Sequence, residues 1–514
     1  MKLNLFIKLI HYLLLTATSF SLYSQNHFEI IRDFENHRYY EEGRGILEID
    51  NFLYITSKAI SYEYPKLLIS KYTANGDLIR DMLREEFQTT QNCINYVDDT
   101  LFITGLNIDG FHQSTIAADT SGNFLDFQVD CISDMYPGLT ISSTVVYGDY
   151  LVTSRNSINS AETEVDVELC WINLKTGLID TMIIEDFGFD DRIGDLQVDQ
   201  DSLLTVVYLY RDSNINTDYY RKIQKFNLQK EKVWEWTSEK LDFYTQFDGF
   251  TLAILEDGRM VHTNGRVYRP QDVNGSLRAI NLDGSLSWYY DLPIWEFPSE
   301  ERFYQYQHYH LIRTRNNELV GCGTYQDADN KGYLFKLSSE GELLWERYYY
   351  TDSIVYYTEL GNEARVNGGI FFDVEELENG DLAVVGTRQS HRKNEEDEWI
   401  REDDLWILRL NDEGCLEDYC GESRFTTIPI VDIVEENSSN KYRIYPNPVA
   451  DIINIESLVP LSIQIFDING KLIDKENISV GNNEIDISTL SSGIYYIQCI
   501  DEKGTSQSER IIKL

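Results

Sequence analysis

Short runs of alternating apolar and polar residues recur along most of the chain, and one form of run returns seven times. The first reads LYITS and begins at Leu53. Alternation with a period of two residues, rich in β-branched and aromatic side chains, predicts β-strands. The seven runs begin at Leu53, Leu101, Leu151, Leu203, Met260, Leu319 and Leu382, so successive starts lie 48 to 63 residues apart.

Each run has the same kinds of neighbours. A strand-like segment precedes it across a turn of Asp, Asn or Gly, residues that favour tight hairpins. A third strand follows a longer polar loop, and then comes a turn that contains glycine in six of the seven units. Seven repeats of four antiparallel strands are typical of a β-propeller. We therefore predict an all-β chain whose residues 25–420 form a seven-bladed β-propeller. The preceding segments are GILEI, CINYV, STVVY, DLQVD, TLAIL, HLIRT and FFDVEEL.

The outer edges of the blades carry two further signals. Trp234, Trp288 and Trp345 follow equivalent turns on the expected outermost strand, which predicts packing against the neighbouring blade. Residues 27–34, HFEIIRDF, also alternate like an outer strand. We expect them to pair with LWILRL at 405–410, which would close the ring and remove an exposed edge.

The two ends of the chain differ from this repeat. Residues 1–24 read as a secretory signal peptide, with Lys2 and Lys8 before a short apolar segment and a cleavage site before Gln25. No later stretch is apolar enough to cross a membrane. Residues 421–441 form a polar, acidic linker, and residues 442–514 alternate again, with Asn-Gly and Ser-Gly turns. This last segment is long enough for a small Ig-like β-sandwich.

The tail resembles the C-terminal sorting domain (type A) of the type IX secretion system of Bacteroidetes. That resemblance implies export through the periplasm and the outer membrane with the type IX secretion machinery as partner, followed by surface attachment or release. A D-x-x-G-K turn at 467–471 belongs to it. The other motif residues are Tyr445, Pro446, Asn447, Pro448, Gly493, Tyr495, Lys513 and Leu514.

The repeat itself resembles the PQQ-like and related "DG-L-W" propeller repeats of exported bacterial proteins. The likeness rests on DGSLSW at 283–288 and EGELLW at 340–345, and it extends over about residues 45–420. Quinoprotein dehydrogenases have eight blades and a cofactor pocket with a bound cation. Seven units and no adjacent cysteine pair argue against quinone chemistry, so no cofactor is expected.

Seven cysteines are few for an exported chain of this length. Three lie in strand-like runs, where a free cysteine acts as a small hydrophobe: Cys170, Cys322 and Cys499. Cys93 and Cys131 could pair, although sequence cannot show that they meet. Cys415 and Cys420 are close enough to predict a local disulfide.

The chemistry that the sequence excludes is clearer than the chemistry that it offers. A formal charge of −42 repels phosphate backbones and disfavours nucleic-acid partners. No HExxH, G-x-S-x-G or phosphate-binding GKS or GKT occurs. DADNKG at Asp327 begins like a calcium loop but has Lys331 and Ser338 where acidic ligands belong, so no metal site is assigned.

One aromatic segment is a candidate ligand site. In ERFYQYQHYHLIRT, which enters an innermost strand, an extended backbone would place Tyr304, Tyr306, His308 and His310 on one face. Tyrosine rings and imidazoles at the mouth of a propeller suit a sugar or a metal. Packing between blades is the alternative. We therefore expect a secreted or cell-surface protein that binds a protein or glycan, the other possibilities being a polysaccharide hydrolase or lyase and a structural surface component.

Overall fold

A computed structural model of the chain contains two compact units, residues 1–429 and 430–514. The structure describes 27–32, 40–60, 65–107, 112–131, 143–158, 165–185, 192–211, 219–239, 251–263, 276–291, 305–326, 330–351, 354–357, 363–366, 368–393, 399–416 and 425–428 of the first unit. In the second unit it describes 442–445, 449, 452–457, 459–467, 472–491, 493–501 and 506–513. The described residues are all-β and include no helix that could span a membrane.

The described part of the first unit contains seven sheets that are each built around four antiparallel strands, besides one two-stranded hairpin. Sheet one is β2 (Tyr40–Ile49), β3 (Phe52–Ile60), β4 (Pro65–Thr73) and β5 (Leu78–Glu85). Sheet two is β6 (Phe87–Val97), β7 (Thr100–Asn107), β8 (His112–Asp119) and β9 (Phe124–Cys131). Sheet three is β10 (Thr144–Tyr147), β11 (Tyr150–Ile158), β12 (Val165–Asn173) and β13 (Ile179–Glu185).

The next four sheets repeat this order. Sheet four is β14 (Arg192–Val198), β15 (Leu204–Arg211), β16 (Tyr219–Phe226) and β17 (Lys232–Thr237). Sheet five is β18 (Leu252–Ile254), β19 (Met260–Thr263), β20 (Ser276–Ile280) and β21 (Leu286–Asp291). Sheet six is β22 (Gln305–Arg313), β23 (Leu319–Gln326), β24 (Asn330–Leu337) and β25 (Leu343–Thr351). Sheet seven is β28 (Gly368–Glu376), β29 (Leu382–Lys393), β30 (Trp399–Leu410) and β1 (Phe28–Arg32).

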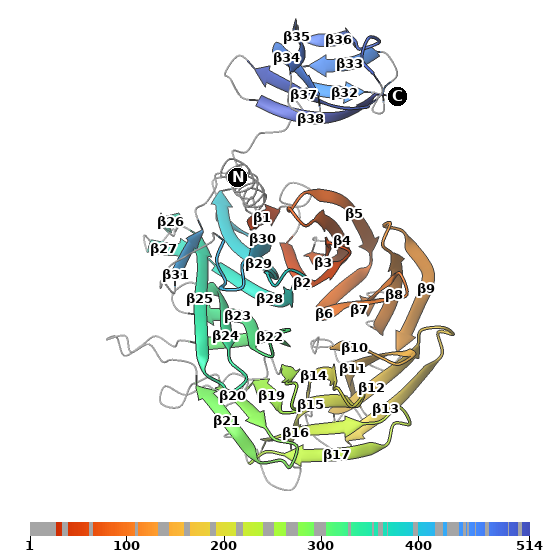
Figure 1. Ribbon diagram of the computed structural model, residues 1–514, viewed down its shortest axis with the longest axis vertical. Helices are drawn as coiled ribbons and strands as arrows, with labels where there is room; N and C mark the ends of the chain where they lie inside the picture. The colour runs from red at the N-terminus through yellow and green to blue at the C-terminus, as the bar shows by residue number, and fades with distance from the viewer. Residues whose placement is uncertain are drawn as a thin grey trace, which may run out of the picture. The chain divides into compact units, whose positions relative to one another are not determined.

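The sheets of the first unit follow one another around a common centre, as in a propeller (Figure 1). The first strand of each sheet, from β2 to β28, is innermost and contacts the first strand of the next sheet. β28 contacts β2 in turn, so the innermost strands form a closed circle.

The N-terminal strand completes sheet seven. β1 pairs antiparallel with β30, with Phe28 opposite Arg409 and Arg32 opposite Leu405. The prediction that the N-terminal segment closes the ring is therefore confirmed. Arg32 also reaches sheet one, where its guanidinium binds both carboxylate oxygens of Asp81 and donates to Ser70 Oγ at 3.1 Å.

Equivalent tryptophans join neighbouring sheets, as predicted. Their indole N–H groups each donate to a backbone carbonyl in a turn of the next sheet. The three bonds are Trp234 to Leu282 at 2.9 Å, Trp288 to Ser339 at 2.9 Å and Trp345 to Asp412 at 3.1 Å. The glycine of that turn has a positive φ, +80° at Gly341, and a Cβ there would lie 2.6 Å from the ring of Trp288. The repeated glycine thus provides the turn conformation and leaves room for the tryptophan.

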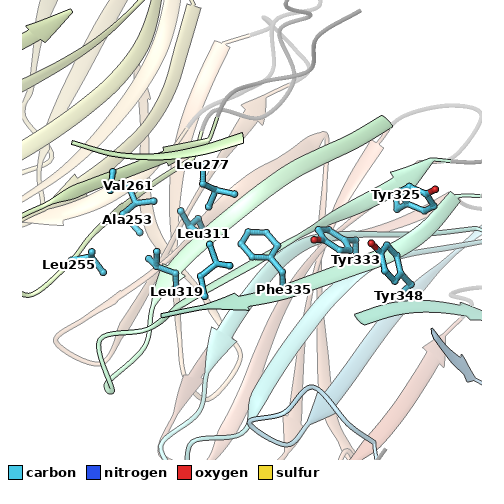
Figure 2. Close-up of a cluster of buried hydrophobic side chains, with 12 residues drawn as sticks. Ala253, Leu255, Val261, Leu277, Leu311, Leu319, Tyr325, Tyr333, Phe335 and Tyr348 are labelled. Carbon is cyan, nitrogen blue, oxygen red and sulfur yellow. The ribbon is translucent and has the colours of Figure 1, made fainter. Parts of the chain in front are cut away.

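Apolar side chains fill the space between adjacent sheets. Figure 2 shows the cluster between sheets five and six, in which Leu277 and Val261 face Leu311 and Phe335. Tyr333 and Tyr348 extend this cluster toward the outer strands, with their ring centroids 5.0 Å apart. Burial of such surfaces is the main stabilising term of the repeat.

The cysteines depart from two expectations. Cys131 at the end of β9 forms a disulfide with Cys170 of β12, which links sheet two to sheet three. Cys170 is therefore not a free hydrophobe, and Cys131 does not pair with Cys93, which is a buried free thiol. The two sulfurs meet because the outer strand of sheet two packs on the face of sheet three. The spacing of the cysteines in the sequence does not predict this contact. Cys322 and Cys499 are free and buried, as expected.

Cys415 is disulfide-bonded. Its predicted partner, Cys420, lies outside the described residues, so that pairing stays a prediction. Mass spectrometry of peptides from non-reduced protein would test it, and two free thiols would contradict it.

The chain adds one more strand before it leaves the first unit. β31 (Phe425–Ile428) pairs in parallel with β25 at the outer edge of sheet six. These residues fall within the predicted linker 421–441 but belong to the first unit. A small hairpin, β26 (Ile354–Tyr357) with β27 (Glu363–Val366), lies between sheets six and seven in the sequence.

The second unit contains two sheets in its described residues. One is β32 (Tyr442–Tyr445), β33 (Ile452–Ser457) and β36 (Gly481–Asp486). The other is β35 (Leu472–Ile478), β34 (Leu461–Asp467), β37 (Gly493–Asp501) and β38 (Ser506–Lys513). Side chains from both sheets share one apolar core, which includes Ile453, Ile455, Ile463 and Ile497.

Candidate functional site

The two ends of the ring are built differently. Tight turns such as 50–51 and 338–342 join first to second strands and third to fourth strands. Because neighbouring strands are antiparallel, all of these turns lie at one end, which we call the turn end. The remaining connections leave from the opposite end, which we call the connection end. They range in length from the single residue Glu86 to long loops such as 238–251 and 292–304. Loops at one end of a rigid scaffold are where binding residues commonly lie.

The predicted ligand residues enter the ring from the connection end. β22 begins there at Gln305, and its backbone pairs Tyr306 with Tyr325 and His308 with Gly323. Tyr304, and the side chains of Tyr306 and His308, lie outside the described part of the chain. Their role as ligand residues therefore stays a prediction.

A β-bulge changes the expected relation among these residues. His308 lies opposite Gly323, whereas His310, two residues later, lies opposite Cys322, the adjacent residue on β23. A strict period of two residues would have skipped one residue on β23. The bulge therefore breaks the alternation from which a single face was predicted for all four residues.

His310 does not lie on an open surface. Its side chain is 9% exposed, and its Nδ1 pairs with the carboxylate of Asp373 on β28. Burial favours the neutral imidazole, but the carboxylates of Asp373, Asp195 and Glu375 outweigh burial and raise the pKa of His310 to about 9. The paired carboxylate thus favours the protonated imidazole of His310 at neutral pH.

His310 belongs to a set of equivalent positions, one on or directly before each innermost strand, that we call the inner ring. These positions lie opposite nearly the same point of the repeated run on the second strand. Asp373 lies opposite Val385 and Gly45 opposite Thr56, each three positions after the start of the run, and Asp195 lies opposite Val207, four positions after it. Bulges adjoin this position on β2, β6, β14, β22 and β28. The seven members are Gly45, Cys93, Ser143, Asp195, Thr251, His310 and Asp373.

Buried carboxylates of the inner ring are fully engaged by donors. Asp195 accepts from Ser143 Oγ at 2.5 Å and from the backbone N–H groups of Leu196 at 2.8 Å and Leu252 at 2.9 Å. Burial raises the pKa of Asp195, and the nearby charge of His310 opposes that rise. Such carboxylates bind strands together.

Sequence reasoning missed Asp195, Asp373 and Ser143 as members of one set. The signal was present, because the first residue of each predicted inner segment is Gly, Cys, Ser, Asp, Thr or His, with Asp in FFDVEEL two positions later. What the sequence could not give was the partner of each, which lies on a different sheet.

Glu375 is the strongly perturbed carboxyl group beside this set. Burial, together with the neighbouring Asp373, raises the pKa of Glu375 to about 8. Within the described ranges, no group of three or more His, Cys, Asp or Glu side chains is arranged to hold a metal ion.

The predicted sorting residues that the structure describes lie at or near the ends of strands in the second unit. Tyr445 ends β32, Gly493 begins β37, and Tyr495 donates its hydroxyl to the carbonyl of Ser491 at 2.9 Å. Lys513 ends β38 and bridges to Val449. The other four motif residues lie outside the described part: Pro446, Asn447, Pro448 and Leu514.

Comparison with known families identifies the class of the C-terminal unit. Residues 443–513 match the family described as secretion system C-terminal sorting domain. The match includes Tyr445, Gly493, Tyr495 and Lys513. The chain therefore carries a type IX sorting domain, which indicates Bacteroidetes-type export to the cell surface or the medium and involvement of the type IX machinery.

Comparison of the rest of the chain gives only distant structural likenesses. No curated protein sequence matches. The β-propeller domain of the trilobed protease from Pyrococcus furiosus is 10% identical, with 74% of this chain and 97% of that chain covered and a TM-score of 0.39. The acylaminoacyl peptidase of Pyrococcus horikoshii is 12% identical, with 81% and 58% covered and a TM-score of 0.41. A protein of unknown function from Dyadobacter fermentans is 7% identical, with 74% and 98% covered and a TM-score of 0.38. At such low scores these likenesses carry no argument about function.

Proposed function

We propose that this chain is an exported binding protein: a seven-bladed β-propeller over residues 25–420, a C-terminal Ig-like sorting domain, and a protein or glycan ligand at the connection end of the ring. Residues 1–24 would be the signal peptide that starts export. The ligand would meet the start of β22, where Tyr306 and His308 offer an aromatic face and hydrogen-bonding groups.

The observation that supports this proposal best is the inequality of the two ends. Every turn at the turn end is short, and the glycines and tryptophans there are used to join the sheets. Length and sequence variety are concentrated in connections such as 132–143, 238–251 and 292–304. A repeat that keeps one end uniform and elaborates the other provides a rigid base for a recognition surface.

The chemistry of the inner ring also favours binding over catalysis. Asp195 and Asp373 accept backbone N–H groups from neighbouring strands, and His310 is paired with Asp373. Groups engaged in this way stabilise the scaffold. A catalytic acid and base would need to reach substrate from this set or from the connections.

The test is a glycan array, together with a panel of purified surface proteins, probed with the full mature chain from residue 25. We expect saturable binding to a defined glycan or protein. The same bound oligosaccharides should be recovered intact after prolonged incubation. Cleavage products would overturn the binding assignment in favour of a hydrolase or lyase, and absence of binding across the panel would favour a structural surface component.

A further inference from the structure

The two aspartates of the inner ring occupy the same place in two groups of three sheets. Asp195 of sheet four accepts from Ser143 of sheet three and from the N–H of Leu252 in sheet five. Asp373 of sheet seven pairs with His310 of sheet six and accepts the N–H of Ile46 in sheet one at 2.9 Å. Each carboxylate also accepts the N–H of the residue that follows it, at 2.8 Å in both cases.

The donors around Asp195 and Asp373 come from equivalent positions. The side-chain donor is the inner-ring residue of the preceding sheet, and the backbone donor comes directly after the inner-ring residue of the following sheet. We call each arrangement a three-sheet clamp. The clamp at Asp373 spans sheets six, seven and one, which is where the ring closes through β1. Only the side-chain donor differs, a serine hydroxyl in one clamp and an imidazole in the other.

We propose that these clamps hold the ring shut, and that the clamp at the closure, because its donor is an imidazolium in direct contact with the carboxylate, loosens as pH rises more than the clamp at Asp195 does. A charge-assisted hydrogen bond is roughly twice as strong as a neutral one. Loss of the proton from His310 therefore weakens the bond to Asp373 while all heavy atoms stay in place. Serine has no such titration.

The groups that face His310 are few. Asp373 and Glu375 approach from β28, Asp195 from β14, and the thiol of Cys322 lies opposite on β23. The described residues of β18, which packs on β22, contribute no titratable group. Burial, together with Asp373, raises the pKa of Cys322 well above that of an ordinary thiol, so Cys322 stays neutral through the range that matters. Among these neighbours, Asp195 and Glu375 also have raised pKa values.

The sign of the effect follows from the direction of the shift. Because the pKa of His310 is raised from 6.5 to about 9, its contribution to stability is complete below pH 6.5 and is lost as pH rises through 9. Glu375 loses stability over a lower window, from about its usual value of 4.5 to about 8, since its folded pKa is also raised. A Glu375→Gln background therefore isolates His310 above pH 6.5.

The experiment is hydrogen exchange of the full mature chain, read at the amides of Ile46 and Leu252 by mass spectrometry with electron-transfer fragmentation. Both amides donate to an inner-ring aspartate, so Leu252 is the internal control for Ile46. Protection is corrected for intrinsic exchange and compared at pH 6.5 and pH 9.5 in the Glu375→Gln chain. We expect protection at Ile46 to fall at least about tenfold relative to Leu252, with a ceiling of roughly two orders of magnitude set by the pKa change.

Two variants complete the design. In His310→Gln, a neutral donor replaces the imidazolium, so the ratio of protection at Ile46 to protection at Leu252 should be low at both pH values. In Ser143→Ala, protection at Leu252 should fall equally at both. If His310→Gln fails to fold, the ratio of protection at Ile46 to protection at Leu252, measured in steps between pH 6.5 and 9.5 in the Glu375→Gln chain, decides alone, and it should fall as pH rises. A constant ratio across that range, or a pH dependence that persists in His310→Gln, would overturn the proposal.

Discussion

A single methyl group at Gly341 should destabilise the first unit far more than the same change at Gly380. Both glycines lie in tight turns with positive φ, +80° and +90°. Alanine in that conformation costs roughly 1–2 kcal/mol at either site. At Gly380 a Cβ would meet no atom within 4 Å, whereas at Gly341 it would lie 2.6 Å from two ring carbons of Trp288. Overpacking of this kind adds about 1–3 kcal/mol.

Urea unfolding of the full mature chain, followed by tryptophan fluorescence, measures this difference cleanly. All eight tryptophans precede residue 430, so the signal reports on the first unit alone. We expect Gly341→Ala to lower the free energy of unfolding by about 2–5 kcal/mol, and Gly380→Ala by about 1–2. In a Trp288→Leu background the cost at Gly341 should shrink to that at Gly380. Equal losses in the two single variants would refute the view that turn glycines make room for the tryptophan of the preceding sheet.

Three other changes test separate parts of the structure. Replacing Cys131 and Cys170 by Ser should cost about 2–4 kcal/mol, because the bridge joins two sheets across 39 residues; an unchanged urea midpoint would argue against the bridge. Arg32→Ala should cost roughly 1–3 kcal/mol at ring closure, whereas Lys175→Ala, which breaks an exposed ion pair, should leave the urea midpoint nearly unchanged; similar losses would contradict the closure role. Truncation after Lys441 should leave folded protein in the periplasm, and protease-accessible display of the truncated chain on intact cells would contradict the sorting assignment.

Much of the fold was predictable because the same pattern of strands and turns recurs seven times along the chain. Each repeat supplied an independent alignment of the same strands and turns, so that the run at Leu53 could be checked against the run at Leu382. Ring closure was predictable for a related reason. Residues 28–32 alternate like an outer strand, but they lie outside the seven repeated units, so they had to pair with a strand distant in the sequence. β31 was missed because a four-residue strand has too little pattern to stand out from a linker.

The candidate site was less predictable, because its determinants lie between repeats. Alternation correctly placed residues 305–313 on an innermost strand, but the bulge before His310 shifts the register and leaves no mark in the amino-acid pattern. The partner of His310, Asp373, lies 63 residues away on the next sheet. The Cys131–Cys170 bridge was missed for the same reason. Periodicity predicts what lies within a sheet, and contacts between sheets require the three-dimensional arrangement.

The most direct test of the account is a binding titration of the chain with Tyr306 and His308 both replaced by Ala, against the strongest ligand from the array. The same preparation is melted in parallel by tryptophan fluorescence. A matched control carries Asp283→Ala, which alters a turn at the turn end. We expect lost binding and an unchanged melting temperature in the double variant, with binding intact in the control. A lowered melting temperature with binding intact would contradict it, because these residues would then serve the packing of the sheets.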